Sequence, residues 1–176
     1  TLSNLVLAAS TRNSEFVVPV GVSGGLDPSY EWASVQGTVC AFYSKQDPAS
    51  PLQTLAVPGL KPPDISNRFT LEERNLLLFN GHGTWNVDDG GVVRMERVIT
   101  SYRKNVSGFD DDSYLNLETM KTMAYLRYDT RTLIAQRYPR HKLAQDGTAF
   151  GRGQNDVTPD IVRNTLIGRF SLWEEH

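Results

Sequence analysis

The sequence has little cysteine: Cys40 is the single one among 176 residues. One cysteine cannot form an internal disulfide, and the three histidines lack the spacing of a zinc site. No apolar run approaches the roughly 20 residues that a membrane-spanning helix needs, and no charged segment followed by an apolar one opens the chain as a leader would. We therefore expect a chain suited to a reducing compartment, with no bound metal, no cofactor and no membrane span.

An excess of charge of one sign is also missing. Eighteen basic residues stand against 20 acidic ones, which leaves a formal net charge of −2. Without a basic field to attract a polyanion, nucleic acid is not an expected partner. The composition, with 39% hydrophobic residues, excludes collagenous and wholly disordered chains. Residues 68–143 hold 12 of the basic and 10 of the acidic residues, a mixture typical of a solvated surface or a specific protein contact.

Helical and strand patterns alternate along the chain. The spacing of apolar residues and the end signals predict five helices, two short apolar strands and one β-hairpin. The fold class is therefore α/β or α+β. The expected helices cover residues 2–10, 28–46, 70–79, 117–137 and 158–176, the expected strands 15–22 and 52–57, and the hairpin about 83–102.

Three local signals make these expectations specific. Asp27 is a candidate N-cap, followed by proline at the first helical position. Thr70 and Glu73 form the pattern of a capping box, in which each side chain bonds the other's backbone amide. The Asp-Asp-Gly-Gly run at 88–91 predicts the turn of the hairpin. Pro19 demotes the first strand toward a sheet edge or a bulge, because proline has no N–H to donate.

Three features could carry chemistry. His82 stands between two glycines, but a general base needs an orienting carboxylate and a nucleophile that the sequence alone does not bring to it. Asp110, Asp111 and Asp112 precede the long helix and favour charge at its N-terminus over a calcium site, whose ligand spacing is absent. The glycine-rich run at 21–25 matches no phosphate-binding motif and is interpreted as a turn.

On the helix expected at 117–137, several cations could project from one side: Lys121, Arg127 and Arg131, together with Arg137. Such a face is usually solvated. The alternative is a lattice contact with acidic residues of a neighbouring copy. The spacing leaves both interpretations open.

Several stretches, in order, resemble the tail sheath proteins of Mu-like contractile phages and prophages. No single motif is diagnostic, and the specificity comes from the order and spacing of many short matches over nearly the whole chain. The stretches are residues 30–33, 47–55, 74–81, 98–105, 115–117, 125–127, 137–143 and 157–159, among them YEWA, RNLLLFNG and RYPRHKL.

The resemblance implies a structural role in the virion. Sheath subunits stack around a rigid tail tube, and contraction of the lattice drives the tube through the host envelope during genome ejection. The implied partners are other copies of the subunit and the tail tube protein, with assembly in the cytoplasm of the bacterial host. The central region of the family is described as a subtilisin-like, helix-flanked sheet without a protease triad, so we expect no enzyme activity.

Family members are considerably longer than this chain and carry a C-terminal domain that exchanges strands between subunits. The resemblance therefore implies a fragment, with residues 1–156 in an N-terminally incomplete subtilisin-like domain and residues 157–176 beginning a C-terminal domain. Whether it assembles or stays monomeric is left open. The expected interface residues are Arg103, Lys104, Asp110, Asp111, Asp112, Arg127 and Arg131. The alternatives are a hydrolase of subtilisin-like architecture that uses His82, and a monomeric adaptor domain.

Overall fold

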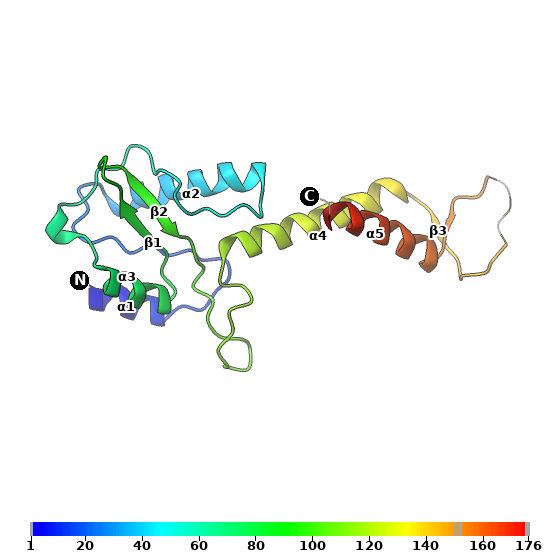
Figure 1. Cartoon of the computed structure of the whole chain (residues 1–176). Helices are drawn as coiled ribbons and strands as arrows, with labels where there is room; N and C mark the ends of the chain where they lie inside the picture. Colours follow the sequence, from blue (N-terminus) through cyan, green and yellow to red (C-terminus); the bar gives the residue numbers. More distant parts are fainter. Residues whose placement is uncertain (1, 150, 152, 175–176) are drawn as a thin grey trace. The chain divides into compact units, whose positions relative to one another are not determined.

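The computed structural model describes residues 2–149, 151 and 153–174, in two units that we treat separately (Figure 1). Unit 1 comprises residues 1–123 and unit 2 residues 124–176. Helix α4, Leu117–Arg137, begins in unit 1 and continues into unit 2. Helices combined with small sheets confirm an α+β fold class. The subtilisin-like character of residues 1–156 stays a prediction.

The centre of unit 1 is the expected β-hairpin. Strand β1, Thr84–Val87, pairs antiparallel with β2, Val93–Arg97. Asp88 closes the turn, because its Oδ1 accepts the amide of Val92 at 2.8 Å and its Oδ2 pairs with the Arg94 guanidinium at 2.6 Å. Gly91 has a φ of 78°, a conformation that glycine adopts without steric cost. The second strand is shorter than expected, because the Thr100 amide bonds instead to the carbonyl of Leu115 at 2.7 Å.

Extended segments flank the hairpin on both sides, where two strands were expected. On the β2 side, the amides of Thr54 and Val57 donate to β2 carbonyls at 2.7 and 2.8 Å. On the β1 side, residues 15–22 make only an isolated parallel bridge, between Val20 and Gly83. The expectation of regular strands at 15–22 and 52–57 was therefore wrong. At 15–22 the reason is physical: Pro19 lacks the N–H that a ladder with β1 would use, and only its carbonyl takes part, accepting from Gly83 at 2.8 Å.

Helices cover the two faces of this small sheet (Figure 1). Helix α2, Ser29–Gln46, lies on one face, and α1, Leu2–Ser10, lies with α3, Leu71–Phe79, on the other. A short 3₁₀ helix, Ile65–Asn67, precedes α3. The capping box at α3 is confirmed, with Thr70 Oγ1 accepting from the Glu73 amide at 3.3 Å and the Glu73 carboxylate accepting from the Thr70 amide at 2.8 Å.

The expected N-cap of α2 does not form. Asp27 was expected to cap α2, but Pro28 occupies the N-cap position and makes no side-chain hydrogen bond to the helix. The Asp27 carboxylate instead accepts the amide of Lys61, 34 residues away, at 2.6 Å. A tertiary partner therefore replaces the local one, and Asp27 ties the proline-rich loop to the start of α2.

The core of unit 1 lies between α2 and the hairpin. The Trp32 and Trp85 rings pack with centroids 4.9 Å apart, and the Cys40 sulfur lies 3.9 Å from that of Met95. Burial raises the pKa of the Cys40 thiol to about 11, so this thiol stays protonated. The buried cluster consists of Trp32, Cys40, Leu52, Val57, Leu60, Trp85, Val93, Met95, Val98 and Leu117.

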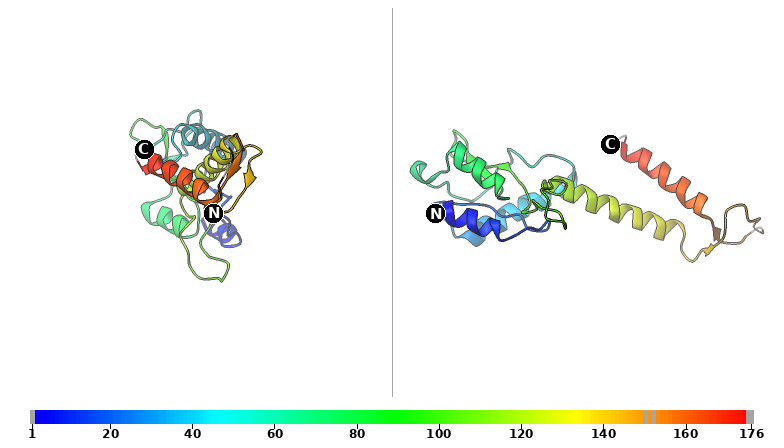
Figure 2. Two further views of the ribbon diagram at one scale, coloured as in Figure 1. Left: turned by 90° about the vertical axis from the view of Figure 1, so that its right-hand side faces the viewer. Right: turned by 90° about the horizontal axis from the view of Figure 1, so that it is seen from below.

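Unit 2 is built from the rest of α4, two short strands and a final helix. Strand β3, Lys142–Leu143, pairs parallel with β4, Asp156–Val157, and α5, Pro159–Glu174, turns back at an angle to α4 (Figure 2). The Arg169 guanidinium of α5 donates through two nitrogens to the Asp129 carboxylate of α4, and Trp173 Nε1 donates to the same group at 3.1 Å. These contacts join α5 to α4 within unit 2. The domain boundary expected after residue 156 stays a prediction. The assignment of residues 157–176 to a C-terminal domain stays a prediction.

Candidate functional site

Five of the seven expected interface residues meet in one projecting loop of unit 1, residues 102–112, which we call the charged loop. Lys104 and Asp110 form an antiparallel bridge, and the Asp111 amide donates to the Arg103 carbonyl at 2.9 Å. The carboxylate of Asp111 accepts the phenol hydrogen of Tyr102 at 2.7 Å. Residues six to nine apart in sequence are thus held as the two arms of a hairpin.

The base of the charged loop is fastened to the segment after α1. The side-chain oxygen of Asn13 accepts the amides of Arg103 and Lys104 at 2.7 and 3.0 Å, while its nitrogen donates to the Lys104 carbonyl at 2.7 Å. One asparagine therefore satisfies three backbone groups of a segment about 90 residues away. This anchoring favours a loop with a fixed direction over a flexible one.

The tip of the charged loop is organised by Asn105 and exposes apolar side chains. Its Oδ1 accepts the amides of Ser107 and Phe109 at 3.0 and 3.1 Å, and Gly108 adopts a φ of 83°. Val106 and Phe109 are 107% and 71% exposed. The sequence analysis missed both residues, although their position beside the Asn-x-Ser-Gly turn signal could have identified them as a loop tip.

The three aspartates of the charged loop are not grouped as the ligands of a cation would be. Hydrogen bonds from Ser113 and Tyr102 hold the pKa of the Asp111 carboxyl below its usual value, and the same Asp111 contact raises the pKa of Tyr102 to about 12. Asp111 is thus occupied by hydrogen bonds within the loop. Among the described residues, no three His, Cys, Asp or Glu side chains are grouped as a metal site would require. Asp110 and Asp112 are exposed and available to a partner.

The other two expected interface residues lie on α4 in unit 2. Arg127 and Arg131 are both exposed and stand one helical turn apart, so their side chains share a face of the helix. Asp129 lies between them in the same turn, and its carboxylate is bonded to Arg169 of α5 on the opposite side of the helix. The outer face of α4 therefore carries exposed cations, whereas the face toward α5 carries the Asp129 carboxylate bonded to Arg169.

Unit 2 also presents apolar surface beside a very short sheet. The amides of Lys142 and Ala144 donate to the carbonyls of Asn155 and Val157 at 2.8 and 3.0 Å, so the intervening residue, Leu143, has its backbone groups on the outer edge. The Leu143 side chain is 88% exposed. It borders a groove of about 520 Å³ whose floor is the apolar stripe of α5, formed by Val162, Leu166 and Phe170.

His82, the candidate catalytic residue, is buried. It is 4% exposed, and its Nε2 lies 2.9 Å from the carbonyl of Leu5 in α1, which accepts the hydrogen bond. Burial lowers the pKa of the imidazole, and the nearby charge of Arg103 lowers it further. Among the described residues no carboxylate bonds to the ring, and Nδ1 has no partner. Within the part of the chain that the structure describes, no acid orients the ring as in a triad.

Comparison with known proteins assigns a family to this sequence. The phage tail sheath C-terminal domain family matches residues 110–176. The chain is 44% identical over 174 residues, 99% of its length, to the Mu-like prophage FluMu tail sheath protein of Haemophilus influenzae. It spans 36% of the length of that relative. By sequence, residues 110–176 therefore match the tail sheath C-terminal domain family, and nearly the whole chain is similar to about a third of a Mu-like prophage tail sheath protein.

Proposed function

We propose that the chain is part of a structural subunit of a contractile tail sheath. In this role it assembles with copies of itself around the tail tube, first in the host cytoplasm and then as part of the virion tail. Contraction of the lattice drives the tube through the host envelope. The observation that carries the proposal is the 44% identity over 99% of the chain to a tail sheath protein.

The charged loop and the outer face of α4 support a role in assembly. A lattice that changes between two states needs contacts that break and re-form, which favours modest polar contacts over a large apolar interface. Arg103, Lys104 and the three aspartates lie on an anchored loop, and Arg127 and Arg131 lie on a helix. Rigid elements hold charges in a fixed register, so that identical copies can match them.

The open sheet of unit 2 supports a second kind of contact between copies. A two-stranded sheet of two residues per strand is marginal by itself, and additional strands would stabilise it. The outer edge at Leu143 offers one amide and one carbonyl, next to an apolar groove. This edge fits the strand exchange that the resemblance implies.

We also propose that the chain has no catalytic role. The burial of His82 and its bond to the Leu5 carbonyl support a structural use of the imidazole. Peptidase assays of the wild-type chain and of His82→Ala are expected to show no turnover in either. A turnover that His82→Ala abolishes would contradict this part of the proposal.

The assembly proposal is tested with a chimera in which this chain replaces the aligned region of the Haemophilus relative. Negative-stain electron microscopy is expected to show hollow tubes, as for the unmodified relative under the same conditions. The double variant Arg127→Glu, Arg131→Glu is expected to shift the product from tubes to free subunits, because it reverses the cationic face of α4. Lys45→Glu, an exposed reversal on α2, is the matched control and should leave tubes intact.

A chimera that stays dispersed while the relative forms tubes would contradict the proposal and favour the adaptor alternative. Equal tube formation by both charge variants would leave the sheath function standing and would remove Arg127 and Arg131 from the interface.

A further inference from the structure

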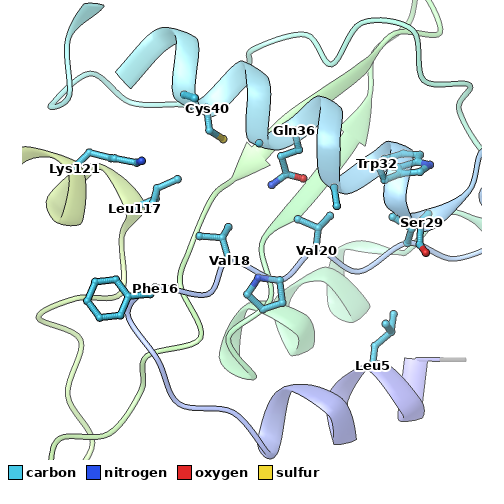
Figure 3. Close-up of a pocket in the computed structure, with 15 residues that line it drawn as sticks. Leu5, Phe16, Val18, Val20, Ser29, Trp32, Gln36, Cys40, Leu117 and Lys121 are labelled. Carbon is cyan, nitrogen blue, oxygen red and sulfur yellow. The ribbon is translucent and has the colours of Figure 1, made fainter. Parts of the chain in front are cut away.

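A groove of about 550 Å³ in unit 1 runs over the edge of the sheet, along residues 16–22 (Figure 3). Trp32, Gln36 and Cys40 of α2 lie on one side, and Leu5 of α1 lies on the other. Leu117 and Lys121, at the start of α4, close one end. Two helices therefore extend past the last strand of the sheet, leaving a space between them that no described segment fills.

The backbone along the groove has one bonded edge and one free edge. The carbonyls of Val17 and Pro19 accept the amides of Ser101 and Gly83 at 2.8 Å each, so these two residues face the interior of the unit. In an extended segment the intervening residues point their backbone groups the opposite way. Within the described part of the chain, Val18 and Val20 make no backbone hydrogen bond.

Pro19 occupies the inner side of this edge. Its missing N–H weakens pairing with β1 but leaves the outer donors and acceptors of Val18 and Val20 intact. Natural sheet edges are usually blocked by charged side chains, proline on the open side or a covering element. None of these protects the open side of Val18 and Val20 among the residues that the structure describes. Phe16, at the end of the groove, is 80% exposed.

The two helix layers define what can fill the space. A strand added beside residues 16–22 would be covered by α2 on one face and by α1 on the other. Strands covered on both faces are apolar on both, so the occupant must be a largely apolar segment, unlike an amphipathic edge strand. The extended segment at 54–57 is not available, since it already pairs with β2.

We propose that this edge is completed by an apolar β-strand of the same sheath polypeptide, from the part that lies outside the region covered by this chain. The Haemophilus relative supplies the length, because this chain spans only 36% of it. The inference rests on the proposed function for the source of the strand. Backbone bonds to Val18 and Val20 bind the strand, and the apolar groove selects its side chains.

Amide hydrogen exchange of the chimera described above, kept as unassembled subunits, tests the inference against the isolated chain. In the isolated chain, the Val18 and Val20 amides are expected to exchange fast, while the bonded amides of Gly83 and Ser101 are protected. In the chimera, the Val18 and Val20 amides are expected to slow by about 100-fold or more, as for a strand inside a sheet. Because the subunits are unassembled, this readout is independent of tube formation.

A matched pair of variants at one position sharpens the test. In the chimera, Val18→Pro removes the outward donor and should return the Val20 amide to fast exchange. Val18→Ala keeps the donor and should leave the protection in place. The Gly83 and Ser101 amides report whether each variant is folded. Equal exchange of Val20 in the chimera and the isolated chain would overturn the inference. Concentration-dependent protection in the isolated chain would also overturn it, because a second copy would then be the occupant.

Discussion

The contact between Asp129 and Arg169 is the strongest link between the two helices of unit 2, and its removal has a calculable cost. Substitution of Asp129 by Asn keeps the size of the side chain and removes its charge. The Asp129 side chain is 15% exposed and the Arg169 side chain 33% exposed. Charge-assisted hydrogen bonds in partly buried pairs contribute about 1.5–3 kcal/mol. Since a third of Arg169 remains in water, we expect a loss of about 1–2 kcal/mol.

The assay is native-state hydrogen exchange of α5 amides in the full 176-residue chain. A loss of 1–2 kcal/mol makes the exchange of the most protected α5 amides about 5–30-fold faster. The matched control is Asp160→Asn, which breaks the Asp160–Arg163 pair on the same helix. Both partners of that pair are more than half exposed, so the control should change exchange by less than about twofold.

The pH dependence provides an internal check. The hydrogen bonds from Arg169 lower the pKa of the Asp129 carboxyl. A lowered folded-state pKa contributes stability that is present above the unfolded value, about 4, and is lost as the pH falls through the folded value. The difference between the wild-type chain and Asp129→Asn should therefore shrink below about pH 4. Similar effects of Asp129→Asn and Asp160→Asn at neutral pH would refute the reasoning.

Two further predictions concern unit 1. Thr70→Ala removes the N-cap of α3 and should lower the free energy of unfolding by about 1 kcal/mol, whereas Thr70→Ser keeps the cap and should keep the wild-type stability. Urea denaturation measures both variants. Equal stability of all three chains would contradict the role of the cap. Burial lowers the pKa of His82, so the unfolded chain binds this proton more readily, and stability should fall as the pH drops below about 6.5, by at most about 1.4 kcal/mol per pH unit. His82→Gln should remove that part of the pH dependence in urea titrations at pH 7 and pH 5; an unchanged profile would place its origin elsewhere.

Signals between close neighbours in sequence determined much of the secondary structure. The helix Leu117–Arg137 has the expected bounds, and the capping box at Thr70 forms as its spacing predicts. The hairpin turn at 88–91 likewise follows from its Asp and Gly residues. In each case the deciding hydrogen bonds join residues three or four apart, so the chain carries the information locally. The family resemblance was available from the order of many short matches and is confirmed by comparison.

Tertiary structure decided every feature in which the partner is distant in sequence. The Asp27 carboxylate accepts the Lys61 amide instead of capping α2, and Asn13 anchors a loop about 90 residues away. His82 became a buried group bonded to Leu5, 77 residues earlier. The free edge at Val18 and Val20 depends on the distant partners of Val17 and Pro19, which are Ser101 and Gly83, and on the helices α1 and α2 that border it. Such contacts depend on which surfaces pack together, and the spacing of residues along the chain does not specify that packing. The burial that results then sets the energetic cost or gain of each polar group.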